Sequence, residues 1–156
     1  MENYKSINTP LVQNKKLCKE DEAAKVDETK YRSMVGYLLY LTATRSDIMY
    51  AASFLSRFMN GPSEMHLKAT KRVLRYIRGC ADLGIWFRKA KKLNLYGYSD
   101  SDWGGSLDNM KSTSCYVFYL NSGAISWISK KQKVVAQSTT EVEYISDVAA
   151  VNQLIG

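Results

Sequence analysis

The chain has 156 residues, of which 46% are hydrophobic and 24% are charged, and its formal net charge is +7 at pH 7. This composition excludes a disordered tail, and the length suffices for one domain or two small ones with a modest core. The excess of basic residues points to an acidic partner, and nucleic acid is the commonest polyanion.

The cysteines and the hydropathy pattern indicate in which cellular compartment the protein is expected. Cys18, Cys80 and Cys115 are odd in number and far apart, which argues against a disulfide framework or a zinc cluster and favours a reducing compartment. The N-terminus lacks the apolar core of a signal peptide, and no run of about 18 apolar residues could cross a bilayer. We therefore expect a soluble intracellular protein, in the cytoplasm or the nucleus, without a membrane partner.

The first half of the chain reads as helical. Residues 1–30 are polar without a sustained period and predict an extended lead-in. A first helix is predicted over Tyr31–Thr42 from the recurrence of apolar residues at helical spacing. A second helix follows, with Ser46 as its N-cap and Asp47 in its first turn, and ends before Asn60-Gly61-Pro62.

A third helix is predicted from about Ser63 to Arg78, with Pro62 in its first turn. One face is apolar, and the single histidine, His66, falls on it as a partly buried structural residue. The other face carries five basic residues. They either contact phosphates, which makes binding salt-dependent, or form an ordinary solvated face. These residues are Lys68, Lys71, Arg72, Arg75 and Arg78.

Beyond Cys80 the hydrophobic period changes from 3.6 to 2, which predicts a sheet. Two successive hairpins would build it as an antiparallel sheet. The predicted strands are residues 83–88, 93–100, 115–120 and 124–129, with a brief further strand at 134–136. A short basic link before that last strand supplies three more candidate contacts to nucleic acid, which are Lys130, Lys131 and Lys133.

Two carboxylates mark the end of the strand that begins at Leu93. The strand runs into Asp100, and Asp102 follows two residues later on the same side, before a glycine turn. Carboxylates at such a place suit a hard cation such as Mg²⁺. Aspartate is also a common turn former, so these residues and Asp108 have a purely structural alternative.

The sequence S-T-T-E at Ser138–Glu141 is a capping box and predicts a terminal helix. Val142, Ile145, Ala149 and Gln153 would share its apolar side. Glu143 lies on the shoulder of that stripe, with Asp147 one turn later. Glu143 is either part of a charged helix edge or leans over the sheet toward Asp100.

The order of the predicted elements resembles the start of the ribonuclease H fold. A strand that ends in Asp is followed by a glycine turn, a hairpin and a helix with a Glu in its first turns. Several blocks in one order also resemble the Pol polyprotein of copia-type LTR retrotransposons. These blocks are residues 31–48, 74–79, 97–105, 125–132 and 138–144, with a further match at 3–10. The resemblance therefore covers nearly the whole chain.

This resemblance implies an α+β chain. Residues 31–80 would be the helical tail of a reverse transcriptase with its connection, and residues 81–156 an incomplete ribonuclease H-like domain. Asp100 matches the family's first metal-binding aspartate and Glu143 its metal-binding glutamate, so both are the implied catalytic and metal residues. In the intact enzyme they would help to hold two Mg²⁺ ions while the RNA strand of an RNA/DNA hybrid is cut. Remaining Pol segments or a second copy are the other implied partners.

Departures from the family pattern shape the functional expectation. The family's two other acids would follow Gly156, so we expect a domain truncated at its C-terminus, inactive alone, with residual nucleic-acid binding. Ser46, Cys80 and Cys115 stand where proline, threonine and glycine are usual, as in a degenerate copy. Two alternatives are an active or complemented ribonuclease H, and a non-enzymatic helical module that contacts proteins through residues 31–59.

Overall fold

The structure is a computed structural model that describes residues 5–13 and 16–155. The chain divides into two compact units, residues 1–84 and 85–156, which we call the helical unit and the sheet unit. Residues 1–4 and 14–15 of the predicted lead-in lie outside the described residues. The α+β fold class predicted from the sequence is confirmed.

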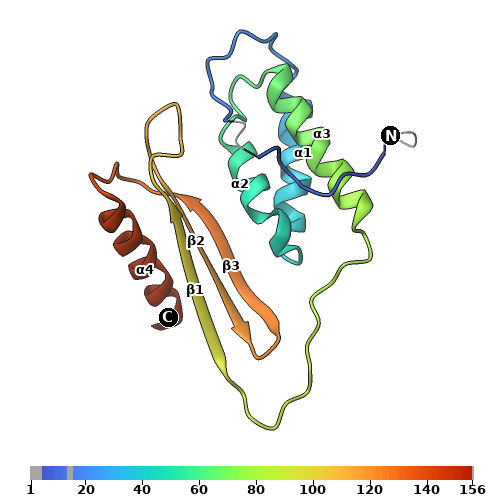
Figure 1. The fold of residues 1–156 in the computed structure, drawn as a ribbon. Helices are drawn as coiled ribbons and strands as arrows, with labels where there is room; N and C mark the ends of the chain where they lie inside the picture. Colours follow the sequence, from blue (N-terminus) through green and yellow to red (C-terminus); the bar gives the residue numbers. More distant parts are fainter. Residues whose placement is uncertain (1–4, 14–15, 156) are drawn as a thin grey trace. The chain divides into compact units, whose positions relative to one another are not determined.

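The helical unit contains α1 (Glu28–Leu41), the 3₁₀ turn η1 (Ser46–Ile48), α2 (Met49–Ser56) and α3 (Glu64–Gly79), which are grouped together in Figure 1. The helix α1 begins three residues earlier than predicted. The reason is that the side chain of Asp27 accepts hydrogen bonds from the backbone N–H groups of Thr29 and Lys30 and so caps the helix.

The predicted start and end of the second helix are wrong. Ser46 opens the 3₁₀ turn instead of capping a helix, and α2 begins at Met49 without a side-chain cap. The carboxylate of Asp47 is held by Arg45 and Tyr76, which keeps this turn in place. The α-helix ends at Ser56, earlier than the predicted end just before Asn60.

The helix α3 begins after Ser63, so Pro62 precedes the N-cap and does not lie in the first turn as predicted. Ser63 and His66 form a reciprocal capping box, in which the backbone N–H of Ser63 donates to His66 Nδ1 at 3.0 Å. His66 is fully buried and stacks on Phe58 with ring centroids 4.0 Å apart. It is therefore a structural residue, as predicted, although more deeply buried than expected.

The core of the helical unit repeats the predicted helical spacing. Its buried side chains are Tyr31, Val35, Leu38, Ile48, Ala51, Ala52, Leu55, Phe58 and Val73, with Leu17 from the lead-in. The lead-in also makes backbone hydrogen bonds beside the start of α3. The N–H of Val26 donates to Pro62 O and the N–H of Glu64 to Ala24 O, both at 2.9 Å. The lead-in is thus attached to the helices over these residues.

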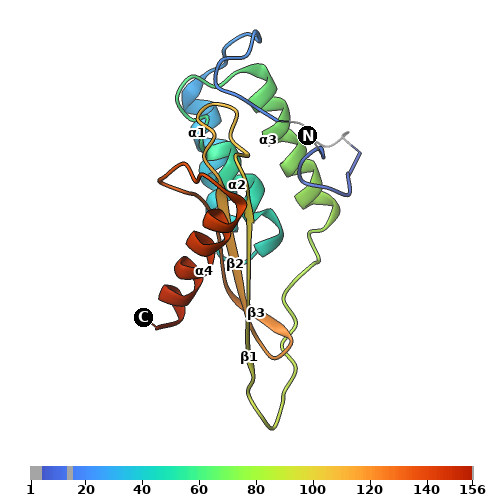
Figure 2. The same ribbon diagram turned by 60° about the vertical axis from the view of Figure 1, so that its left-hand side comes forward.

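The sheet unit contains β1 (Leu95–Asp102), β2 (Thr113–Leu120), β3 (Gly123–Lys131) and α4 (Thr139–Ile155). The strands are antiparallel in the order β1-β2-β3, and Asp100 pairs with Cys115, which pairs with Ser129. The helix α4 packs on one face of this sheet, against β1 and β2 (Figures 1 and 2).

Two predicted strands are wrong. Residues 83–88 form no strand, because the backbone N–H of Arg88 donates to Ser122 Oγ, and that hydroxyl donates to Trp86 O. These contacts hold the segment against the β2–β3 turn and replace a strand ladder. Residues 134–136 also form no strand and belong to the connection between β3 and α4.

The helix α4 begins at the predicted capping box. Ser138 Oγ accepts a hydrogen bond from the N–H of Glu141 at 3.2 Å, and Glu141 Oε2 accepts one from the N–H of Gln137 at 2.7 Å. The buried line of the helix is Val142, Ser146 and Ala150, not the predicted line through Ile145 and Ala149. Within residues 5–13 and 16–155, no helix is long and apolar enough to cross a membrane.

Candidate functional site

Asp100 lies near the end of β1 and is exposed. Its backbone carbonyl accepts a hydrogen bond from Ser146 Oγ of α4 at 3.0 Å. Its carboxylate oxygen Oδ1 accepts one from the N–H of Ser101 at 2.8 Å. The helix is therefore tied to the strand at the position of the first predicted metal ligand.

The neighbours of Asp100 define the two faces of β1. Ser99 donates a hydrogen bond to the carboxylate of Asp147 in α4, so Ser99 faces the helix. Since side chains alternate along a strand, Asp100 leaves the opposite face. Asp102 accepts a hydrogen bond from the N–H of Thr113 on the paired strand, which gives it the structural role that one reading of the sequence expected.

Glu143 is exposed and lies one turn before Asp147 in α4. The contacts of Ser99 with Asp147 and of Asp100 with Ser146 show that α4 and β1 run in opposite directions. Four helical residues rise about 6 Å, which is about two strand residues. Glu143 therefore lies about level with Ser101, at the end of β1 that carries Asp100.

Glu143 belongs to the helix that covers one face of the sheet, and the Asp100 side chain leaves the other face, so a cation shared by the two carboxylates would have to lie at the free edge of β1. In the part of the chain that the structure describes, only β2 pairs with β1, and residues 95–100 are exposed. The described residues hold no cluster of three or more His, Cys, Asp or Glu side chains that could bind a metal ion. These residues alone do not fit a catalytic Mg²⁺ site, and a shared role of the two acids stays a prediction.

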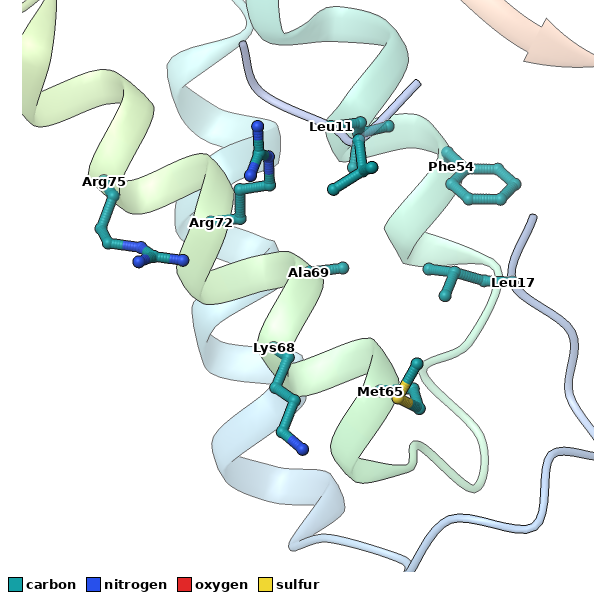
Figure 3. A pocket seen from close by; sticks show the side chains of 9 residues that line it. Leu11, Leu17, Phe54, Met65, Lys68, Ala69, Arg72 and Arg75 are labelled. Atoms are coloured by element: carbon teal, nitrogen blue, oxygen red, sulfur yellow. The ribbon is translucent and has the colours of Figure 1, made fainter. Parts of the chain in front are cut away.

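The five basic residues predicted on α3 separate into two groups. Lys71 and Arg78 are exposed to solvent. Lys68, Arg72 and Arg75 border a cavity of about 180 Å³ between α3, α2 and the lead-in (Figure 3). The sequence did not predict this cavity, because the lead-in carries no periodic signal that would place it on the helices.

The three predicted basic residues Lys130, Lys131 and Lys133 border a second cavity, of about 280 Å³, between the sheet and α4. Lys130 and Lys131 belong to β3, not to the predicted link, and Lys133 follows the strand. Between them Gln132 is 6% exposed, and its Nε2 donates to Ser114 Oγ at 2.8 Å and to Val142 O at 3.2 Å. Gln132 thereby joins β3, β2 and α4, and it was not singled out from the sequence.

A polar network that sequence reasoning missed connects the turn before α2 with the end of α3. Arg45 holds both carboxylate oxygens of Asp47, at 2.9 and 2.7 Å, and donates to Cys80 O at 3.1 Å. Tyr76 donates to Asp47 at 2.9 Å. The Arg45 guanidinium lowers the pKa of Asp47, and burial followed by the Asp47 carboxylate raises the pKa of Tyr76 to about 12.

Comparison with known proteins identifies relatives over most of the chain. It is 47% identical over 142 residues, 91% of its length, to the retrovirus-related Pol polyprotein from transposon RE1 of Arabidopsis thaliana. It is 42% identical over 153 residues to that from transposon TNT 1-94 of Nicotiana tabacum. The match covers only 10% and 11% of those polyproteins.

A third relative is much shorter than these polyproteins. The chain is 46% identical over 117 residues to the secreted RxLR effector protein 161 of Plasmopara viticola, and the match covers 82% of that protein. No family model and no solved structure matches the chain.

Proposed function

We propose that the chain is the reverse transcriptase to ribonuclease H junction of copia-type retrotransposon Pol polyproteins, because it is homologous to a segment of such polyproteins over 142 to 153 residues. In this proposal residues 31–80 are the helical connection. Residues 81–156 are the first part of the ribonuclease H domain. The parent polyprotein hydrolyses the RNA strand of RNA/DNA hybrids, and this chain alone binds nucleic acid without cutting it.

The observation that carries this proposal is the attachment of α4 beside the end of β1. The hydrogen bond from Ser146 to Asp100 O joins the helix that carries Glu143 to the strand end that carries Asp100, which supports a shared role of the two predicted acids. Two carboxylates with water ligands can hold a divalent cation weakly. A catalytic site would need further ligands, supplied at the free edge of β1.

The first experiment tests whether Asp100 and Glu143 share a cation. Mn²⁺ is added to the isotopically labelled chain, and we expect paramagnetic broadening centred on both residues at millimolar Mn²⁺. Asp100→Asn should remove the broadening at Glu143, while Asp82→Asn, an exposed acid outside the sheet, should leave it unchanged. Broadening at Glu143 that survives Asp100→Asn would refute the shared site.

The second experiment tests nucleic-acid binding and cleavage. A labelled RNA/DNA hybrid should bind with an affinity that falls at least tenfold between 50 and 200 mM salt. The reason is that basic side chains displace counterions at each phosphate they contact, and we expect on the order of several such contacts. It should remain uncut in Mg²⁺. Cleavage that Asp100→Asn abolishes would replace this proposal by an active ribonuclease H.

A second candidate function is an interaction module without enzymatic activity. It is favoured by the relative named as a secreted effector, whose length the chain nearly spans. The exposed aromatic residues of α1 would supply contacts, since Tyr37 and Tyr40 are 71% and 82% exposed. Hybrid binding that is absent at low salt, or that ignores salt, would favour this module over the nucleic-acid proposal.

A further inference from the structure

The cavity beside α3 combines cationic and apolar walls. Its basic side chains, Lys68, Arg72 and Arg75, all leave α3, and Ala69 points from the same helix toward Leu17 (Figure 3). Leu11, Phe54 and Met65 complete the apolar wall. Such a cavity suits a ligand with an anionic end and a carbon-rich end.

The hydrogen bonds of Arg72 indicate which kind of ligand the cavity suits. One of its guanidinium nitrogens, Nη2, donates to Thr9 Oγ1 of the lead-in at 2.8 Å. Its Nε is buried and has no hydrogen-bond acceptor within the described residues. A buried donor on a cation is costly without an acceptor, so an oxygen ligand beside Nε would be favoured.

We propose that this cavity binds a phosphomonoester. A phosphomonoester carries a charge between about −1.5 and −2 at neutral pH and three acceptor oxygens, so it can supply the acceptor that Arg72 Nε lacks. The volume of about 180 Å³ is below the roughly 300 Å³ of common ligand pockets, so it admits one small group and not a length of polymer. The apolar wall then covers the carbon atoms attached to the phosphate.

This inference deepens the proposed nucleic-acid function and rests on it for the source of the ligand. A phosphomonoester occurs at the 5′-phosphorylated end of a strand and in a free mononucleotide. Either source would use the same contacts to Arg72, and the experiment distinguishes them.

The full chain is titrated with inorganic phosphate, deoxyadenosine monophosphate, and one oligonucleotide with either a 5′-phosphate or a 5′-hydroxyl. The Nε–Hε NMR signal of Arg72 is followed. We expect this signal to shift with the monophosphate, and the 5′-phosphorylated strand to bind at least fivefold more tightly than the 5′-hydroxyl strand. A shift with the mononucleotide but not with the strand assigns the site to free nucleotides.

Matched variants separate this site from general attraction to basic charge. Arg72→Gln and Arg78→Gln remove the same charge from the same helix, but only Arg72 borders the cavity. Arg72→Gln should weaken monophosphate binding at least tenfold and Arg78→Gln less than twofold. Equal losses in both variants would overturn the proposal.

A third variant covers the case in which Arg72→Gln does not fold. Ala69→Leu fills the cavity and keeps every charge, and it should weaken monophosphate binding at least fivefold while hybrid binding changes less than twofold. Unchanged monophosphate binding in a folded Ala69→Leu protein would overturn the inference. If the unmodified chain does not bind the RNA/DNA hybrid, the proposed function is refuted instead. Failure of the phosphomonoester site and failure of the proposed function are therefore distinguishable.

Discussion

At the scale of single residues, Asp47 is a side chain whose removal gives a sharp prediction. Both its oxygens are held by Arg45, and one also accepts a hydrogen bond from Tyr76. Asp47→Asn should lower the free energy of unfolding by about 1 to 3 kcal/mol at pH 7, since hydrogen bonds to charged groups are lost. Urea denaturation followed by circular dichroism measures this change.

The pH dependence of this effect has a definite sign. Arg45 keeps the pKa of Asp47 below its ordinary value of 3.8 in the folded state. The stabilisation is therefore present above about pH 4 and is lost as the pH falls through the folded-state pKa. The difference in free energy of unfolding between the native chain and Asp47→Asn should be smaller at pH 3 than at pH 7.

As a control, Glu64→Gln should lower the free energy of unfolding by less than about 0.5 kcal/mol, because Glu64 and Lys68 are exposed and 3.6 Å apart.

At the scale of secondary-structure elements, the pairing of β1 with β2 depends on a close contact at Gly97. A Cβ atom at this position would lie 2.6 Å from Phe118 Cε1, and Phe118 is 4% exposed. Gly97→Ala should therefore destabilise the sheet unit by about 1 to 3 kcal/mol, measured by urea denaturation with tryptophan fluorescence.

Two further variants test the cause of this destabilisation. Gly84→Ala meets nothing within 4 Å and should change stability by less than about 0.5 kcal/mol. In a Phe118→Leu background the cost of Gly97→Ala should fall below about 1 kcal/mol, because the smaller side chain leaves room for the methyl group. An unchanged cost in that background would show that the ring contact is not the cause.

At the scale of the whole molecule, each unit has buried residues of its own, and we expect two unfolding transitions. All three tryptophans, Trp86, Trp103 and Trp127, belong to the sheet unit, so their fluorescence reports on that unit. Gly97→Ala should shift the fluorescence transition, and Asp47→Asn should shift only the circular dichroism change of the helical unit. Equal shifts of both signals by both variants would contradict independent units.

The exposed edge of the sheet unit should make its unfolding transition depend on protein concentration. Leu95 and Tyr98 on β1 are 53% and 62% exposed, and an unpaired edge strand promotes association between copies. The fluorescence transition should therefore move with protein concentration. A sharp, reversible transition at a constant urea concentration over a hundredfold dilution would contradict this expectation.

The helices were predictable because their signal is local. The stripe through Tyr31, Val35 and Leu38 repeats at helical spacing, and the same residues are buried. The capping box at Ser138 likewise placed the start of α4 within one residue. Boundaries failed where tertiary contacts decided them, as at Asp47, whose partners Arg45 and Tyr76 lie on different segments.

The strands were less predictable because alternation alone does not supply a partner. Residues 83–88 alternate as a strand does, yet Ser122 takes their backbone hydrogen bonds. For the candidate acids, the sequence correctly predicted that Asp100 lies near the end of a strand and that Glu143 lies in a helix. Only the contacts of Ser99 with α4 and of Ser146 with β1 show that the Asp100 side chain leaves the face away from α4.

The sequence by itself determined the α+β class, the buried stripe of α1 and the basic residues of α3, because these follow from periodicity and charge along one segment. The tertiary structure decided the two cavities, the network around Asp47 and the separation of Arg72 from Arg78. These features join residues far apart in the chain, such as Thr9 and Arg72, and no local pattern encodes such a contact.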